Sequence, residues 1–121
     1  MLPHYLCTKA ELEFKEGKFE SARSDAEEAL EAANTVGNKR AAAAARIVLA
    51  DINASLGQPR EGEAQLQEAA VLYKALGAKA ELGETYMRLS RLAATVDPRT
   101  AQKYADLAYK ATKKTSALVE R

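Results

Sequence analysis

Residues 49–77 have the sequence LADINASLGQPREGEAQLQEAAVLYKALG, in which two apolar patterns are separated by a short joint that contains Gly57 and Pro59. The apolar residues after this joint keep the three- and four-residue spacing of one helix face: Leu66, Ala69, Ala70, Tyr73 and Leu76. Gly57 and Gly77 suit the left-handed residue that follows a helix, whereas Pro59 suits a first helical turn. Because the joint is short, the stretch predicts two helices that fold back antiparallel to each other.

Similar joints occur along the whole chain. Glycine recurs every 20 residues, at Gly17, Gly37, Gly57 and Gly77. The turn signal Asp97-Pro98 comes next, and Asp97 is a suitable N-cap for a last helix. Alanine is abundant, tryptophan is absent and only three prolines occur, so helix formers dominate over strand formers. The sequence therefore predicts an all-α fold.

The repeating unit is a pair of helices, because segments match best at a spacing of 40 residues. KAELEFKEG at 9–17 aligns with LADINASLG at 49–57 and with LSRLAATVD at 89–97. Small residues recur where helices would cross, at Ala10, Ala50 and Ser90 in the first helices and at Ala22, Ala26, Ala29 and Ala69 in the second. One pair buries too little surface to be stable alone. We expect a single domain over residues 1–121, with approximate repeats at 3–37, 38–77 and 78–117.

These residues resemble the tetratricopeptide-repeat (TPR) family, in its longer-unit branch of about forty residues. The most typical stretch runs from Leu49-Ala50-Asp51-Ile52 through Leu56-Gly57 to Glu68-Ala69-Ala70 and Leu76-Gly77. The aromatic residue that the shorter-unit pattern has near the end of its first helix is replaced by Glu13, Asn53 and Ala93. The resemblance implies a right-handed α-solenoid of three antiparallel helix pairs. Because the chain begins almost inside its first helix, we expect it to be a fragment of a larger protein.

Composition argues against several classes of partner and site. Eighteen basic residues face 17 acidic ones, a formal net charge of +1, so no overall field attracts nucleic acid or an anionic membrane. No apolar run approaches the ~20 residues of a membrane span. The single cysteine Cys7 and the single histidine His4 supply too few ligands for a closed metal site. We expect a cytoplasmic protein without cofactor, metal, nucleic-acid partner or membrane partner.

Catalytic motifs are missing as well. The sequence has no phosphate-binding glycine loop, no histidine-rich metal motif and no nucleophile elbow. Adjacent carboxylates such as Glu27 and Glu28 point to different faces of a helix and cannot flank one bond. We therefore predict that the chain is not an enzyme.

In the TPR family the first helix of each pair lines a concave surface where ligands bind, and the resemblance implies the same here. Position by position, this stripe holds His4, Cys7, Glu11 and Phe14, then Ala44, Ile47, Asp51 and Ala54, then Glu84, Met87, Arg91 and Ala94. We predict that a peptide or protein partner contacts Glu11, Phe14, Ile47, Asp51, Met87 and Arg91.

Each part of this prediction has an alternative. Glu11, Asp51 and Arg91 take equivalent positions in successive repeats, which suits an extended peptide with a basic residue near one end and an acidic residue near the other. The alternative, which the sequence favours, is that all three are solvated charges on helix faces that pair with neighbouring side chains. Phe14, Ile47 and Met87 form either an apolar floor for a partner or part of the core.

The function that follows is a protein–protein interaction scaffold with a peptide or partner protein in its concave groove. One alternative is a structural spacer, or a self-association module that forms a homo-oligomer through its terminal helices. Another is the TPR sensor segment of a bacterial signalling or transcription regulator.

Overall fold

The computed structural model describes the backbone of residues 2–120 and the side chains of residues 5–112. Over these residues the chain forms six α-helices and no strand. The helices are α1 (Leu2–Lys15), α2 (Phe19–Val36), α3 (Lys39–Ser55), α4 (Pro59–Leu76), α5 (Lys79–Ala94) and α6 (Pro98–Glu120). The predicted all-α class is confirmed.

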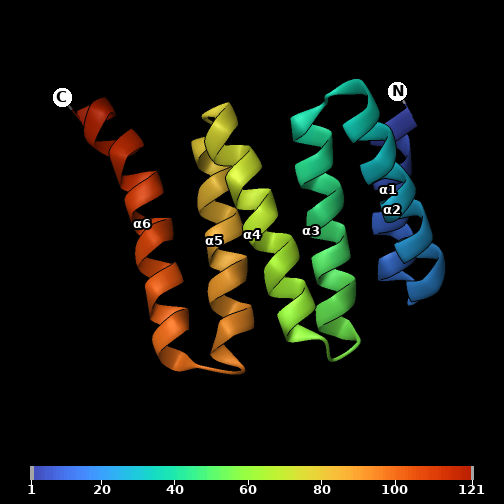
Figure 1. Ribbon diagram of the computed structural model, residues 1–121. Coiled ribbons are helices and arrows are strands. Elements are labelled where there is room, and N and C mark those ends of the chain that lie inside the picture. The colour runs from blue at the N-terminus through green and yellow to red at the C-terminus, as the bar shows by residue number, and fades with distance from the viewer. Residues whose placement is uncertain (1, 121) are drawn as a thin grey trace.

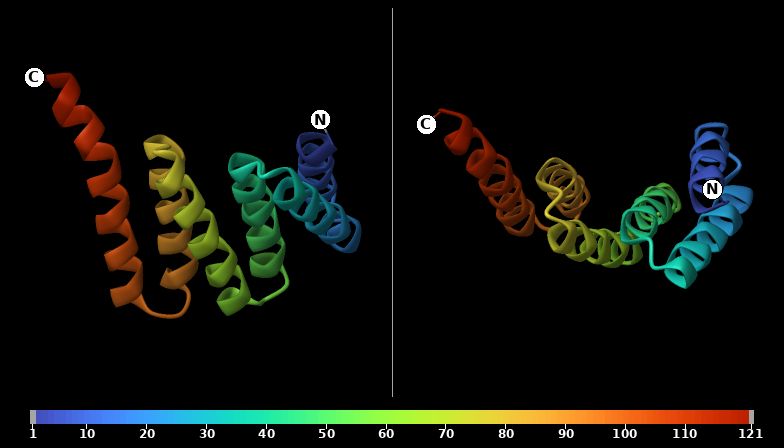
Figure 2. Two further views of the ribbon diagram at one scale, coloured as in Figure 1. Left: turned by 45° about the horizontal axis from the view of Figure 1, so that its top comes forward. Right: turned by 90° about the horizontal axis from the view of Figure 1, so that it is seen from above.

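Consecutive helices run antiparallel and form three pairs in a row, α1 with α2, α3 with α4, and α5 with α6 (Figure 1). The pairs join through contacts of α2 with α3 and of α4 with α5. Seen from above, the row is curved, with α1, α3 and α5 along its inner side and α2 and α4 along its outer side (Figure 2). We call the inner side the concave face. The predicted solenoid of three helix pairs is confirmed.

The turn residues define the helix ends as the sequence predicts. All four glycines of the 20-residue series have positive φ angles, between 69° and 81°, which only glycine adopts without strain. Pro59 and Pro98 are the first residues of α4 and α6. The Asp97 carboxylate accepts hydrogen bonds from the Arg99 amide (3.1 Å) and the Thr100 hydroxyl (2.7 Å), so it caps α6.

Small residues allow neighbouring helices to approach each other closely. Three fully buried alanines of α2 lie in one cluster with apolar residues of α1 and α3: Ala22, Ala26 and Ala29. At Gly62 in α4, a Cβ atom would lie 3.3 Å from the carbonyl oxygen of Ala50 and 3.1 Å from a methyl group of Leu92. The helix axes can come this close because no larger side chain separates them.

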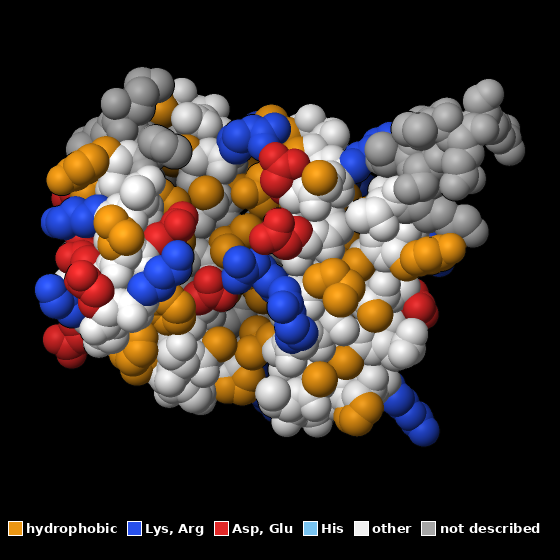
Figure 3. All heavy atoms as spheres, turned by 180° about the vertical axis from the view of Figure 1, so that it is seen from behind, with side chains coloured by type: hydrophobic (Ala, Val, Ile, Leu, Met, Phe, Trp, Pro, Cys, Tyr) orange, Lys and Arg blue, Asp and Glu red, His pale blue; other side chains and the backbone are white. Residues whose placement is uncertain are grey.

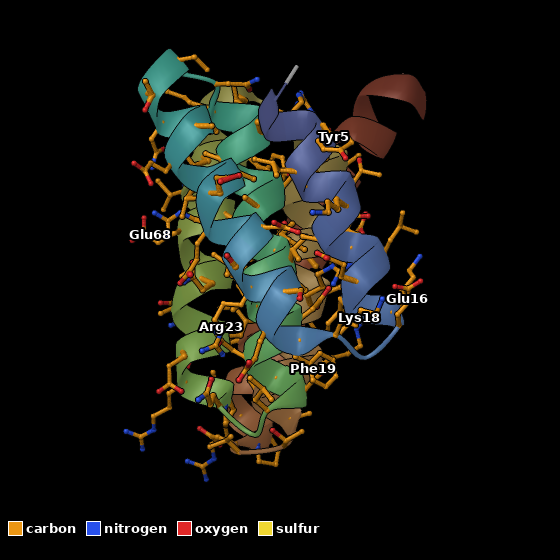
Figure 4. All side chains as sticks on the ribbon, turned by 90° about the vertical axis from the view of Figure 1, so that its right-hand side faces the viewer. Tyr5, Glu16, Lys18, Phe19, Arg23 and Glu68 are labelled. Carbon is orange, nitrogen blue, oxygen red and sulfur yellow. The ribbon has the colours of Figure 1, made fainter. Side chains whose placement is uncertain are left out.

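Polar contacts fix the register between successive pairs. Arg23 extends from α2, low on the side view of Figure 4, and its Nη2 donates to the side-chain oxygens of Asn53 (3.4 Å) and Gln58 (3.3 Å). The Tyr104 hydroxyl of α6 donates to Glu63 (2.9 Å) and accepts from Gln67 (2.7 Å), both in α4. Each contact joins a helix to the preceding or following repeat, so the pairs stack in one defined arrangement.

The face of α1 that carries Lys9 and Leu12 differs from the equivalent face of α3, which carries Leu49 and Ile52. Leu12 is 59% exposed, whereas Ile52, forty residues later, is fully buried. Lys9 takes the position of the buried Leu49 and forms an ion pair with Asp25 (3.3 Å). In α3 this face belongs to the cluster that includes the alanines of α2. In α1 the same face is open and partly charged.

The helix crossings predict a specific response to added volume. Ala69 in α4 is fully buried, so Ala69→Leu should lower the free energy of unfolding by about 1–3 kcal/mol through overpacking. The same substitution at the exposed Ala64 of α4 is the control and should change this free energy little. Urea unfolding followed by circular dichroism measures both. Equal stability of the two variants would refute the crossing.

Candidate functional site

A hollow of about 660 Å³ lies between α3 and α5 on the concave face. We call it the α3–α5 pocket. Apolar residues of α3, α4 and α5 line it, namely Ala50, Ala54, Pro59, Leu66 and Leu92. Three charged residues join them: Asp51, Arg88 and Arg91. The middle of the concave face shows this mixture, with acidic and basic side chains beside apolar ones (Figure 3).

The pocket exists because α3 and α5 lie farther apart than α1 and α3. Among the described residues, α1 and α3 pack alongside each other, whereas α3 and α5 have no comparable contact. Ion pairs bridge the gap instead. Arg40 near the start of α3 pairs with Glu81 near the start of α5, and Arg88 reaches back from α5 to Asp51. The small side chains of Ala50 and Ala54 leave open the space beside the Arg88–Asp51 ion pair.

The residues that line this pocket carry two positive charges and one negative charge, and Glu84 lies just outside the lining. Nη1 of Arg88 donates to both carboxylate oxygens of Asp51, at 2.8 and 2.9 Å, and Nη2 lies 3.7 Å from Glu84. Nε of Arg88 is buried without a hydrogen-bond partner. Arg91 is exposed and makes no hydrogen bond or ion pair with any described residue. Two guanidinium groups therefore face one pocket carboxylate.

The Asp51 carboxylate is held at some energetic cost. Burial raises the pKa of Asp51, and the charges of Arg88 and Arg91 oppose this rise without cancelling it. The charged form of Asp51 is thus less favourable in the folded chain than in water. The Asp51–Arg88 pair is poorly suited to stabilising the fold.

The six residues predicted to bind a partner do not form one site. Asp51 and Arg91 line the α3–α5 pocket, and the other four lie outside its lining. Phe14 packs on the core, with its ring 5.5 Å from that of Phe19, and Ile47 also packs on buried residues. Two others are exposed, Glu11 and Met87. Their part in binding stays a prediction.

The predicted concave stripe needs one correction. Cys7 is only 4% exposed, because it lies in the apolar cluster between α1, α2 and α3. The assignment of Cys7 to an exposed stripe is therefore wrong. The side chain of His4 lies outside the described residues.

Arg88 is not among the residues predicted from the sequence to bind a partner, although one signal of its importance is present. Forty residues earlier the equivalent position holds Val48, which is buried in the core, and eighty residues earlier it holds the exposed Thr8. A charged residue where the preceding repeat has a buried apolar one indicates a local function or a local change in packing. Pro59 and Leu92 were also missed, because their place beside the pocket depends on how the helix pairs stack.

This geometry defines the fold as an α-solenoid of antiparallel helix pairs. A solved structure with the same architecture is the crystal structure of the TPR domain of Arabidopsis FLU, with a TM-score of 0.83. The match covers 93% of this chain and 96% of that chain at 16% sequence identity, so it shows a shared fold. No family model and no curated protein matches the sequence. The predicted TPR resemblance is confirmed at the level of the fold.

The described residues contain neither a metal-binding cluster nor a membrane-spanning helix. No three His, Cys, Asp or Glu side chains there are grouped so that they could hold a metal ion. None of the described helices is both long and apolar enough to cross a membrane.

The environment of Cys7 predicts low reactivity. Burial and the neighbouring Glu11 carboxylate raise the pKa of the Cys7 thiol to about 11, and the thiolate is the reactive form. At pH 8, native protein should react with a disulfide reagent at least about a hundredfold more slowly than protein unfolded in urea, because a free thiol has a pKa of ~8.5. Absorbance of the released thiol measures both rates. Similar rates would show that α1 does not stay packed on α3.

The raised pKa of Asp51 predicts unequal effects of removing the two pocket partners. The charged form of Asp51 opposes folding at pH 7, and this contribution disappears as the pH falls below the folded-state pKa. Asp51→Asn should leave the free energy of unfolding at pH 7 unchanged or raised, with the difference shrinking at acid pH. Arg88→Met should lower it by about 1–2 kcal/mol, because an unpaired carboxylate remains. Urea unfolding at pH 4 and pH 7 tests this, and a large loss from Asp51→Asn would contradict it.

Proposed function

We propose that this chain is a protein-interaction scaffold that binds an extended segment of a partner protein on its concave face, with an acidic side chain in the α3–α5 pocket. The observation that carries the proposal is the unpaired Arg91 beside the Arg88–Asp51 bridge, above an apolar floor. A carboxylate of the partner would balance the excess positive charge. The role requires no catalysis, and we propose no catalytic site.

The size and chemistry of the pocket support this proposal. A volume of about 660 Å³ lies within the usual range of ligand pockets, ~300–1,000 Å³. Apolar walls with a few polar groups are typical of such sites, because the walls give affinity and the polar groups set orientation. The walls belong to helices that are already packed, so little conformational entropy is lost on binding.

The charges in the α3–α5 pocket favour an acidic over a basic residue in the partner peptide. Asp51 was expected to attract a basic residue of the partner. In the structure Arg88 already supplies that charge to Asp51, at 2.8 Å. Arg91 therefore offers the stronger charged contact, and we propose an acidic partner residue as the main determinant.

Stacking of a further helix on α1, as in the spacer or self-association alternative, has less support. The face of α1 that would be covered carries Lys9 in place of the buried Leu49, and Lys9 already pairs with Asp25. Burying this charge pair under an apolar helix would cost free energy of desolvation. The apolar contact between α2 and α3 has no such cost.

The proposed pocket predicts a charge-dependent specificity. Peptides selected from a random display library on the immobilised chain should be enriched in Asp and Glu. Their affinity should fall at least about tenfold for Arg91→Glu, because the variant replaces attraction by repulsion. Lys103→Glu is the matched control on an exposed position of α6 and should leave affinity unchanged. Isothermal titration calorimetry measures each affinity.

Two outcomes would contradict the proposal. Selected peptides without acidic residues would remove the assigned role of Arg91. Equal weakening by Arg91→Glu and Lys103→Glu would show that net charge, and not the α3–α5 pocket, determines binding.

A further inference from the structure

A second hollow, of about 380 Å³, adjoins the α3–α5 pocket. It lies where the start of α4 meets the end of α5 and the start of α6, at the lower edge of the solenoid in Figure 1. Pro59 and Leu92 line both hollows. The two hollows are therefore adjacent, with these apolar side chains between them. We call the second one the edge pocket.

Two ion pairs between α3 and α5 cross the concave face. The Arg88–Asp51 bridge spans α5 and α3 on the side of the α3–α5 pocket nearer the helix starts. Farther along the same side, the Arg40–Glu81 pair spans the same two helices. A chain bound at Arg91 meets neither bridge if it continues towards the end of α5, past Leu92.

The edge pocket suits an apolar side chain. Leu92, Ala93 and Val96 provide apolar lining, and Val96 is 63% exposed. Arg60 also lines the edge pocket, but it is exposed, so its charge stays in contact with water. The two carboxylates of the edge pocket already have partners in the fold. Glu63 accepts from the Tyr104 hydroxyl, and Asp97 caps α6, where the Thr100 hydroxyl and the Arg99 amide lower its pKa.

We infer that the partner segment crosses the lower edge of the solenoid, with its acidic side chain at Arg91 and an apolar side chain over Val96 in the edge pocket. The inference rests on the proposed function and adds the path and sequence pattern of the partner. Arg91 lies in α5 and Val96 lies in the turn that follows it. At ~3.6 residues per turn the two side chains project from roughly opposite sides of the helix, so a partner passes around the helix end, over roughly 13 Å for a helix about 10 Å in diameter. An extended chain covers this distance in about four residues. The partner pattern is an acidic residue and an apolar residue separated by about three positions.

The chain offers a matched control for Val96. Val36 is also a valine at a helix end, is 69% exposed, and lines neither hollow. It is the last residue of α2, next to the turn into α3, at the opposite edge. Replacing either valine by Glu should leave thermal unfolding unchanged, and Val96→Ser and Val36→Ser provide a second, uncharged pair.

The probes are four synthetic peptides with blocked ends that differ in two positions of a Gly-Ser background. Two contain Glu and Leu separated by about three Ser residues, the spacing that an extended chain needs to pass around the helix end, in either order. In their two controls Ser replaces Leu. Nuclear magnetic resonance titration of the labelled chain measures affinity. In at least one order, the Leu peptide should bind about fivefold tighter than its Ser control. Val96→Glu and Val96→Ser should remove this advantage, whereas both Val36 variants should keep it.

Other results would overturn the inference. An advantage of Leu that survives both Val96 variants, or no advantage of Leu in either order, would show that the segment does not cross this edge. Ligand-induced shifts that centre on Met87 and Ile47 instead of Leu92 and Val96 would place the chain along the concave face. The proposed function is decided separately, because loss of affinity in Arg91→Glu alone would support the α3–α5 pocket without the edge pocket.

Discussion

The close approach of helices at positions without large side chains is the constraint on which the structure depends. Three alanines of α2 are fully buried between α1 and α3, and Gly62 of α4 faces the backbone of α3 at Ala50. These contacts fix how each helix lies on the next, because a larger side chain there would force the axes apart. The curvature of the row, and with it the concave face, follows from their sum.

The contact between α1 and α3 differs from the one between α3 and α5. α1 and α3 share an apolar cluster that includes Cys7 and Val48. Between α3 and α5, Arg88 takes the position of that valine and reaches across to Asp51. The contact between α1 and α3 is therefore a buried apolar cluster, whereas the gap between α3 and α5 leaves a charged pocket with room for a ligand. The difference between Val48 and Arg88 at equivalent positions accompanies this change from packing to a candidate binding site.

The sequence was sufficient for the helices and their pairing, because the signals involved act locally. Gly77 ends a helix through its own backbone, and Asp97 caps a helix through an amide two residues away. The pocket depends on contacts between residues 37 positions apart, such as Arg88 with Asp51, and on a gap whose width is set by all three pairs. Spacing along the chain predicted which helices carry Asp51 and Arg91. It could not show that Phe14 and Ile47 pack inwards while Arg88 spans the gap.

The ion pair between Lys9 and Asp25 affects which helices can pack on the face of α1 that carries Lys9 and Leu12. A helix that packs on this face of α1 would have to desolvate the charged pair unless it supplied polar groups of its own. Lys9, which interrupts the apolar repeat pattern, therefore favours a polar neighbour over an apolar one at this face.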